Sequence, residues 1–318
     1  MKVRFQIFTL IILIGGLNGI AVGGWERVHV STLASLRSVF FLDSQKGWIV
    51  GSKGALLTST DGGNSWKLEK AFTRDTLLDV HFTDNENGWL LCERDVYSSG
   101  KNAISYLLRT SDGGKTWESV ELDSGRDRLV RLAFAKDGFG YVFGEGGGVW
   151  QMLDDRSSWK RVQLPVKFLM RGGFFVDSFN GVLVGGSGTT LFTSDAGAEW
   201  NLGSGDKPVQ SKLNDVYFVD ARRGWAVGAG GTILSTINGG KVWRVHTTPL
   251  TEDLFSVCFT NSGLGIAVGD RGRILESSAP NSDWIRVDSG VRARLEDVAA
   301  AGDTVVAVGF GGTILLRK

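Results

Sequence analysis

The chain has 318 residues, with 35 Lys and Arg against 34 Asp and Glu, so its formal net charge at pH 7 is +1. A balance this even gives no global argument for a nucleic-acid partner. Its 2 Cys cannot build a disulfide framework. Its 45 Gly against 4 Pro indicate many tight turns, because Gly supplies the positive φ angles that hairpin corners need.

The first residues have the pattern of a secretory signal. A basic start over residues 1–4 is followed by a largely apolar run over residues 5–17 and then by small residues. We expect cleavage after Ala21 or Gly23, so residues 1–23 are assigned to a signal peptide. The alternative is a retained N-terminal anchor over residues 5–24, a stretch long enough to span a bilayer. Either interpretation predicts an extracytoplasmic protein, in a periplasm, in a thylakoid lumen or secreted.

A repeat that ends in tryptophan follows. Asp61-Gly62-Gly63-Asn64-Ser65-Trp66 recurs as Asp112-Gly113-Gly114-Lys115-Thr116-Trp117, and weaker or degenerate copies continue along the chain. The tryptophans stand roughly 41 to 51 residues apart, which is the period of four-stranded propeller blades. The series comprises Trp25, Trp66, Trp117, Trp159, Trp200, Trp243 and Trp284.

Three short apolar segments precede each Asp turn, and they predict strands. The first ends near an aromatic residue, as in Val39-Phe40-Phe41. The second has the form Gly47-Trp48-Ile49-Val50-Gly51, and the third follows a Gly-rich turn, as in Ala55-Leu56-Leu57-Thr58-Ser59. Apolar and β-branched runs bounded by Gly, Asp and Asn are typical of strands. No long 3.6-residue apolar period follows the N-terminal run, so almost no helix is expected.

These units predict an all-β fold. We expect a seven-bladed β-propeller of four-stranded antiparallel blades, formed as one domain by residues 24–318. The last unit, over residues 295–316, lacks a Trp strand of its own. Trp25-Glu26-Arg27-Val28 is expected to supply it, so that the N-terminal strand completes the last blade and closes the ring.

The Asp-x-Gly-x-x-Trp element, or Asp box, has a structural interpretation. Asp can bind backbone amides of its own turn, Gly permits the turn geometry, and Trp supplies an apolar body between blades. A ring of Asp residues that binds metal or sugar is the weaker alternative, because the degenerate units have lost the Asp or the Gly. No metal site is therefore expected. The residues assigned to the structural role are Asp61, Trp66, Asp112, Trp117, Asp195, Trp200 and Trp243.

Charged residues separate onto two sides of the expected ring. The turns from first to second and from third to fourth strand share one side and carry mostly Asp. The turns from second to third strand and the links between blades share the other side, which is rich in Arg. Arg makes planar, bidentate contacts to carboxylates and suits protein interfaces. A docking surface and a set of locally paired, solvated charges both remain open as interpretations.

One loop interrupts the repeat. Between Leu91 and Ile104 the second unit gains roughly ten residues beyond the short turn usual at that place. By the strand order this loop projects from the Arg-rich side. Long loops on rigid scaffolds often carry function, so residues 91–104 are a second candidate for the binding surface.

Catalytic patterns are absent from the sequence. The three histidines, His29, His81 and His246, fall in different units and lack metal-ligand spacing. There is no Gly-x-Ser-x-Gly elbow, and the Gly-rich turns have no following helix that could make a phosphate cradle. Cys92 and Cys258 lie in separate units, so two buried, unbonded thiols are expected. We expect no catalytic residue and no cofactor.

The repeated elements resemble those of the photosystem II assembly and stability factor propellers of cyanobacteria and chloroplasts. The resemblance covers about residues 25–318 and rests on elements such as Gly47-Trp48-Ile49-Val50-Gly51 with Thr60-Asp61-Gly62-Gly63-Asn64-Ser65-Trp66. It implies a non-enzymatic protein on the lumenal or periplasmic side. In that family an arginine-rich face engages a photosystem reaction-centre precursor or another membrane protein during assembly. The arginines on the matching loops here are Arg74, Arg126, Arg128, Arg171, Arg271, Arg273, Arg292 and Arg294.

The expected partner is thus a membrane-protein client, with no nucleic acid, and the expected state is a monomer. One departure is the missing Cys after the signal sequence, where cyanobacterial members often carry a lipidation Cys. Asp boxes also mark sialidases and other secreted glycosidases. A secreted carbohydrate-binding protein or a sialidase-like glycosidase is therefore the alternative function. The enzyme version requires two carboxylates facing one pocket, about 5 to 9.5 Å apart.

Overall fold

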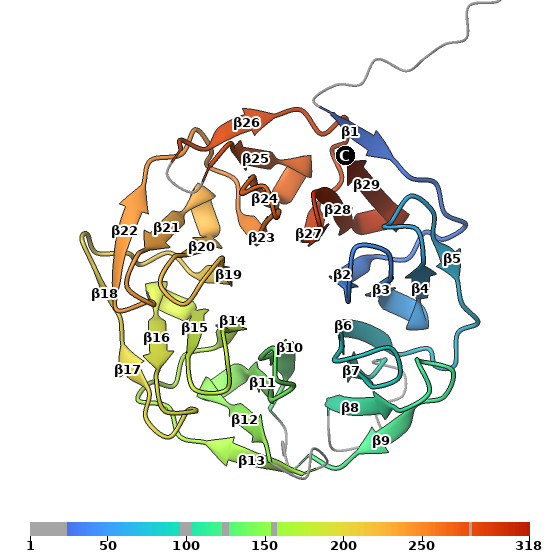
Figure 1. Cartoon of the computed structure of the whole chain (residues 1–318), viewed down its shortest axis with the longest axis horizontal. Helices are drawn as coiled ribbons and strands as arrows, with labels where there is room; N and C mark the ends of the chain where they lie inside the picture. The colour runs from blue at the N-terminus through green and yellow to red at the C-terminus, as the bar shows by residue number, and fades with distance from the viewer. Residues whose placement is uncertain (1–23, 96–103, 123–126, 154–157, 280–281) are drawn as a thin grey trace, which may run out of the picture.

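In the computed structural model the chain forms a closed ring of seven sheets around a central channel (Figure 1). The structure describes residues 24–95, 104–122, 127–153, 158–279 and 282–318. The expected signal or anchor, most of the inserted loop and Arg126 lie outside the described residues. Across the described ranges, no helix is both long enough and apolar enough to cross a membrane.

Each blade runs from an inner strand at the centre of the ring to an outer strand at the rim, in sequence order except at the rims of blades 5 and 7 (Figure 1). Blade 1 comprises β2 (Leu36–Phe41), β3 (Gly47–Gly51), β4 (Leu56–Ser59) and β5 (Lys67–Leu68). Blade 2 comprises β6 (Thr76–Phe82), β7 (Gly88–Glu93), β8 (Ser105–Thr110) and β9 (Glu118–Val120). Blade 3 comprises β10 (Leu129–Phe134), β11 (Gly140–Gly144), β12 (Val149–Met152) and β13 (Trp159–Val162).

The remaining blades follow the same plan. Blade 4 comprises β14 (Met170–Phe175), β15 (Gly181–Gly185), β16 (Thr190–Thr193) and β17 (Asn201–Leu202). Blade 5 comprises β19 (Leu213–Phe218), β20 (Gly224–Gly228), β21 (Ile233–Thr236) and β22 (Val242–His246). Blade 6 comprises β23 (Leu254–Phe259), β24 (Gly265–Gly269), β25 (Ile274–Ser277) and β26 (Ile285–Val287). Blade 7 comprises β27 (Leu295–Ala301), β28 (Thr304–Gly309), β29 (Thr313–Arg317) and β1 (Trp25–Arg27).

Blade 7 joins the two ends of the ring. β1 pairs antiparallel with β29, with Trp25 opposite Arg317 and Arg27 opposite Leu315. The outer strand of this blade therefore comes from the N-terminal end and its other strands from the C-terminal end (Figure 1). The predicted seven-bladed propeller of four-stranded antiparallel blades is confirmed.

Regular structure other than strands is limited to short 3-10 turns in the described residues. Each of them joins a second strand to a third strand, on one side of the ring. They are η1 (Ser52–Gly54), η3 (Glu145–Gly147), η4 (Gly186–Gly188), η5 (Ala229–Gly231), η6 (Asp270–Gly272) and η7 (Phe310–Gly312). The expectation of almost no helix is confirmed for the part of the chain that the structure describes.

The Gly-Trp-x-Val-Gly element is the second strand of a blade, and close neighbours explain both of its glycines. In blade 5 a methyl group on Gly224 would lie 2.6 Å from the ring of Phe218, at the end of the inner strand. A methyl group on Gly228 would overlap the carbonyl oxygen of Lys212, in the link from the preceding blade. Trp225, between them, is buried. The two glycines thus allow the second strand to lie close to the inner strand and to the link from the preceding blade.

The repeated tryptophans pack against the preceding blade. Trp66 of blade 1 clusters with Val306 of blade 7, and Trp243 of blade 5 clusters with Val182 of blade 4. Trp243 also meets Phe218 edge-on, with ring centroids 6.2 Å apart at an interplanar angle of 81°. Edge-to-face aromatic pairs add about 0.5–1.5 kcal/mol to the burial of such large side chains. The tryptophans therefore hold neighbouring blades together.

Blade 5 carries an additional strand that the repeat does not predict. β18 (Ser204–Gly205) pairs in parallel with the outer strand β22. It lies in the link between blades 4 and 5, where the chain stays extended along the rim after β17 (Figure 1). The sheet of blade 5 therefore has five strands, in the order β18-β22-β21-β20-β19.

Candidate functional site

Hydrogen bonds between turns define the two faces of the ring. On one face the Asp-box turn of blade 1 meets the turn between β2 and β3, because Gly62 N–H donates to the carbonyl of Gln45 at 2.9 Å. On the other face the β3–β4 turn meets a link between blades, because Gly54 N–H donates to the carbonyl of Asp75 at 2.8 Å. We call these the Asp-turn face and the Arg-rich face. The inserted loop joins β7 to β8, which is a turn of the Arg-rich face.

On the Asp-turn face the box carboxylates bind their own turns. Asp61 accepts hydrogen bonds from Ser59 Oγ at 2.8 Å, from Ser65 N at 3.0 Å and from Ser65 Oγ at 2.6 Å. Asp112 accepts the same pair of bonds from Thr116, at 2.9 and 2.6 Å. Burial raises the pKa of Asp61, but the bonds from Ser65 and Ser59 outweigh it and hold the pKa below its ordinary value. These carboxylates order the turns and are left with little capacity for an external ligand.

Two of the arginines predicted as site residues each donate two hydrogen bonds to one carboxylate. Arg128 donates from Nε and Nη2 to the two carboxylate oxygens of Glu93, at 2.8 and 3.0 Å. Arg273 donates from Nε and Nη2 to Oε1 of Glu252, at 2.8 and 2.6 Å. Local pairing of this kind neutralises part of the Arg-rich face, as the more cautious interpretation of the sequence anticipated.

Other predicted arginines are exposed and spread around the same face. Arg74 lies in the link between blades 1 and 2, Arg271 in η6, and Arg292 in the link between blades 6 and 7. Arg271 holds a left-handed backbone conformation, with φ at 53°. Within the described residues none of these arginines has an ion-pair partner within 4.0 Å. Arg126 lies outside the described residues.

Arg128, Arg171 and Arg294 lie at the starts of the inner strands β10, β14 and β27, at the mouth of the channel on the Arg-rich face. Burial lowers the pKa of the Arg171 guanidinium, and the positive charges of Arg128 and Arg294 lower it further, while the charge of Asp253 opposes the shift. Among the described residues Arg171 has no ion pair. Arg294 lies 3.2 Å from Glu296, with its guanidinium 3.9 Å from the ring centre of Phe255. The mouth is therefore a crowded cationic site in which charge is only partly compensated.

Arg37 and Lys212 were not among the predicted site residues, but they lie at the same end of the inner strands β2 and β19. Nη1 of Arg37 lies 3.0 Å from Glu296, and Nζ of Lys212 lies 3.1 Å from Asp253. Arg37 has the repeat position of Arg171, the second residue of an inner strand. Comparing the repeats position by position would have found both residues.

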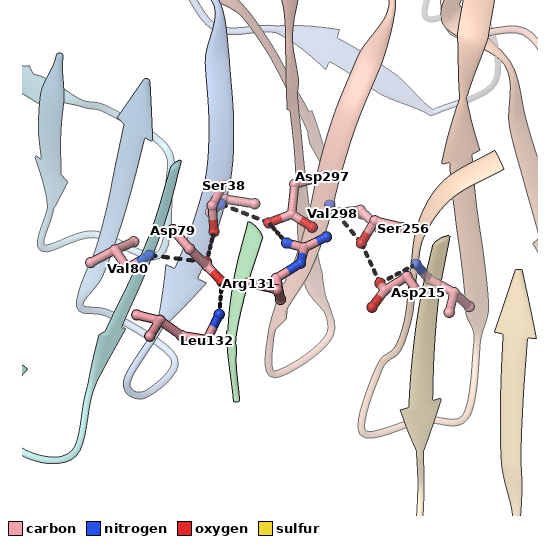
Figure 2. Close-up of polar contacts among 11 residues, drawn as sticks. Ser38, Asp79, Val80, Arg131, Leu132, Asp215, Ser256, Asp297 and Val298 are labelled. Atoms are coloured by element: carbon pink, nitrogen blue, oxygen red, sulfur yellow. Dashed lines mark hydrogen bonds and ion pairs between the residues drawn. The ribbon is translucent and has the colours of Figure 1, made fainter. Parts of the chain in front are cut away.

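Deeper in the channel, polar side chains form a belt (Figure 2). Counted from the buried Leu or Met near the start of each inner strand, they occupy the third position in six blades, and the seventh blade has Gly172 there. A buried Leu lies two positions before each polar residue, and a Val or Leu follows it directly. We call Ser38, Asp79, Arg131, Asp215, Ser256 and Asp297 the channel belt.

The belt carboxylates cap the inner edges of neighbouring blades. Asp79 of blade 2 accepts from Ser38 Oγ at 2.7 Å and from the N–H of Leu132, in blade 3, at 2.8 Å. Asp297 of blade 7 accepts from the N–H of Val39, in blade 1, at 2.9 Å (Figure 2). Inner strands are edge strands whose backbone donors face the channel, and such buried donors need partners.

Asp215 repeats this arrangement between blades 5 and 6, and Arg131 balances the belt. Asp215 accepts from Ser256 Oγ at 2.8 Å and from Val257 N–H at 3.1 Å. Nη1 of Arg131 lies 3.8 Å from Oδ2 of Asp297. Burial raises the pKa of Asp215 to about 6, although the Arg131 charge opposes the shift. One cation therefore faces three buried carboxyls, and burial makes Asp79 and Asp215 hold their protons more tightly than exposed carboxyls do.

His81 and Cys258, which line the channel, and Cys92, in the core of blades 1 and 2, are all neutral. His81 lies between the rings of Phe40 and Phe134, with centroid distances of 4.4 Å to each, and burial lowers its pKa to about 3. Cys92 and Cys258 are both buried and free, as expected, and burial raises the pKa of each thiol. The channel cavity has a volume of about 300 Å³. In the described part of the chain, no three His, Cys, Asp or Glu side chains are grouped so that they could hold a metal ion.

Comparison with known proteins identifies the family. A sequence profile of the photosynthesis system II assembly factor YCF48 family matches residues 18–124, 69–170 and 204–309. The chain belongs to this family. The resemblance inferred from the repeats is thereby confirmed, together with the Asp-box type of repeat.

Relatives of the YCF48 family match only part of the chain in sequence. The photosystem II assembly protein Ycf48 of Synechococcus sp. (strain JA-3-3Ab) is 33% identical over 70 residues, which are 21% of this chain and 21% of the relative. The match thus spans about a fifth of that relative's length. A solved structure described as YCF48 bound to D1 peptide has a TM-score of 0.74 at 20% identity, covering 94% of this chain and 96% of that one. A virginiamycin B lyase from Staphylococcus aureus has a TM-score of 0.76 at 12% identity, over 92% of this chain and 99% of the lyase. Likeness at such identities shows the propeller fold alone.

Proposed function

We propose that this chain is a non-enzymatic, extracytoplasmic scaffold that docks a membrane-protein client through its Arg-rich face. Membership of the YCF48 family supports a role in photosystem II assembly. A family relative was solved with D1 peptide bound, so the proposed client in a photosynthetic host is a reaction-centre precursor. The protein acts as a monomer, and residues 1–23 direct its export.

The observation that carries the proposal is the state of Arg171. Its side chain is half-buried, the positive charges of Arg128 and Arg294 act on it, and it lacks an ion pair among the described residues. Like charges that act on one another repel, and a bound carboxylate relieves that repulsion. Arg also offers a planar fork that suits a carboxylate. A client segment with acidic side chains or a free C-terminus fits this mouth.

A glycosidase in the channel is less well supported. Asp79, Asp215 and Asp297 face the same cavity, as a pair of catalytic carboxylates would. Each of them already accepts a backbone N–H from a neighbouring blade. A carboxylate used in this way cannot leave its partners to protonate or attack a sugar without breaking the contact between blades.

A crosslinking pull-down from host membranes tests the docking face. The test variant carries Arg171→Glu and Arg294→Glu, at the mouth of the channel. The matched control carries Arg222→Glu and Arg223→Glu, which make the same charge change on the Asp-turn face. We expect wild type and control to capture the same membrane protein, and the mouth variant to lose it while its melting temperature stays close to that of wild type.

Three results would count against this function. Equal capture by both variants would exclude the mouth as the docking site, and loss in the control alone would assign docking to the Asp-turn face. Turnover of a glycan panel by the wild type would favour the carbohydrate alternative. The mass of the N-terminus in the exported protein tests the assignment of residues 1–23.

A further inference from the structure

The rim of blade 5 shows how this ring holds an extended segment. The segment that contains β18 runs in parallel along β22. The N–H groups of Ser204 and Asp206 donate to the carbonyls of Lys241 and Trp243, at 3.0 and 2.8 Å. The Asp206 carboxylate accepts the N–H of Val245 at 3.0 Å. An outer edge of the ring thus binds an extended strand that carries an acidic residue.

Blade 2 presents the same edge without a strand on it. Its residues 115–119 have the repeat positions of residues 241–245. Ser119 pairs with Leu108 of β8 in the register in which Val245 pairs with Leu234 of β21. This register turns the Ser119 N–H outward, as it does that of Val245. β9 is the last strand of its sheet, so within the described residues no further strand pairs with this edge.

A groove with a volume of about 610 Å³ lies beside this edge, between blades 1 and 2. Phe72 is 46% exposed and stacks on Trp117, with ring centroids 6.4 Å apart. Trp48 and Leu56 also line the groove. An aromatic pair of one exposed and one partly buried ring, next to an open strand edge, offers both the backbone pairing and the side-chain contacts that strand addition uses.

The charge of the groove selects an acidic occupant. Its lining carries Lys67, Lys70 and Lys115 against one carboxylate, Glu69. Lys67 pairs with Glu69 at 2.9 Å. Lys70 and Lys115 are exposed and have no ion pair among the described residues. Complementary charge favours encounter and register with an acidic peptide.

We propose that the groove between blades 1 and 2 binds an extended acidic segment of a partner protein as an added strand, parallel to β9. In this arrangement a partner carboxylate accepts the Ser119 N–H, as Asp206 accepts that of Val245. Lys70 and Lys115 attract the acidic side chains, and Phe72 with Trp117 packs against an apolar one. The site lies on the rim and is independent of the Arg-rich face.

The test uses a fluorescein-labelled peptide, Leu-Gly-Ser-Gly-Asp-Glu-Pro-Val, which copies residues 202–209 with Glu in place of Lys207. Binding to the full chain is followed by fluorescence anisotropy, with a scrambled peptide as reference. Ser119→Pro removes the outward N–H from an edge position that tolerates Pro, and Ser119→Ala is its matched control. A second variant combines Lys70→Glu and Lys115→Glu.

We expect the peptide to bind wild type and Ser119→Ala alike. Ser119→Pro and the double Lys variant should each weaken binding about tenfold or more, the loss expected for one charge-assisted hydrogen bond or an inverted charge. Circular dichroism and melting temperature check that each variant is folded. Equal binding by Ser119→Pro and Ser119→Ala, or equal binding of the scrambled peptide, would overturn the proposal. Concentration-dependent self-association that Ser119→Pro abolishes would identify a second copy of the chain as the occupant, and would also overturn it.

Discussion

Arg131 is the one cation of the channel belt, and its removal gives a sharp prediction. Arg131→Met keeps a long unbranched side chain in the channel and removes only its charge. The guanidinium lies 3.8 Å from Asp297 and also lowers the pKa of Asp79 and Asp215 against the effect of burial. Removing one partner from a buried charged group costs about 3–5 kcal/mol, because the remaining charge is left uncompensated.

The destabilisation by Arg131→Met is expected to depend on pH. Without the cation, the pKa values of Asp79 and Asp215 in the folded chain lie still further above those in the unfolded chain. The folded state then holds more protons, so the free energy of unfolding falls as pH rises through that range. The loss is largest near pH 8, where every carboxyl must ionise, and most of it disappears near pH 4–5.

Thermal and urea unfolding at about pH 8 and about pH 5 measure this effect. At 2–4 °C per kcal/mol, the expected fall in melting temperature at the higher pH is about 6–20 °C. Arg223→Met is the matched control, because Arg223 forms a half-exposed pair with Asp220 that is worth about 1 kcal/mol or less. If Arg131→Met is no more destabilising than this control at the higher pH, or if acidification does not reduce its effect, the belt is not held by charge balance.

Three further predictions follow from the same structure. Asp215→Asn removes a carboxyl whose pKa is about 6 in the folded chain. Relative to wild type, the unfolding free energy of the variant should therefore rise by roughly 3 kcal/mol between about pH 4 and pH 8. Denaturant titrations at both pH values check this. Asp61→Ala should cost about 1 kcal/mol, while Asp61→Asn should be near neutral in thermal melts, because Asn238 already binds its turn in the same way in blade 5. Gly228→Ala should cost about 1–3 kcal/mol, because the new methyl group overlaps a backbone carbonyl. Gly230 has open space around it, so Gly230→Ala should cost only the strain of a positive φ. Equal losses of stability in thermal melts of the two variants would contradict this.

The fold could be predicted from the sequence because every blade is built from the same short sequence elements. The Gly-Trp-x-Val-Gly strand, the Asp box and the Trp at fixed spacing are all local patterns, and each determines a local geometry. Their period fixed the number of blades, and the absence of a Trp strand in the last unit indicated where the N-terminal strand belongs. β18 was missed because its pairing depends on the path of one link, which no repeat specifies.

The site was predicted less completely because it depends on contacts between blades. Strand order alone placed Arg128, Arg171 and Arg294 on one face, but it could not show that Arg128 is paired with Glu93 while Arg171 has no such partner. The channel belt was missed, since its polar residues lie far apart in the sequence and each belongs to a different strand. The signal was present: the third position, counted from the buried Leu or Met of the inner strand, is polar in six of the seven blades.

The pairing of β1 with β29 has a consequence for biosynthesis. Trp25 and Arg317 are pairing partners although almost the whole described chain separates them in sequence. β1 is therefore synthesised long before β29, the strand with which it pairs. During synthesis or export, blade 7 is incomplete and both of these edges are open to other chains. Closure of the ring therefore depends on the pairing of β1 with β29. A circular permutant with its new termini in a loop between two other blades should complete blade 7 without this requirement.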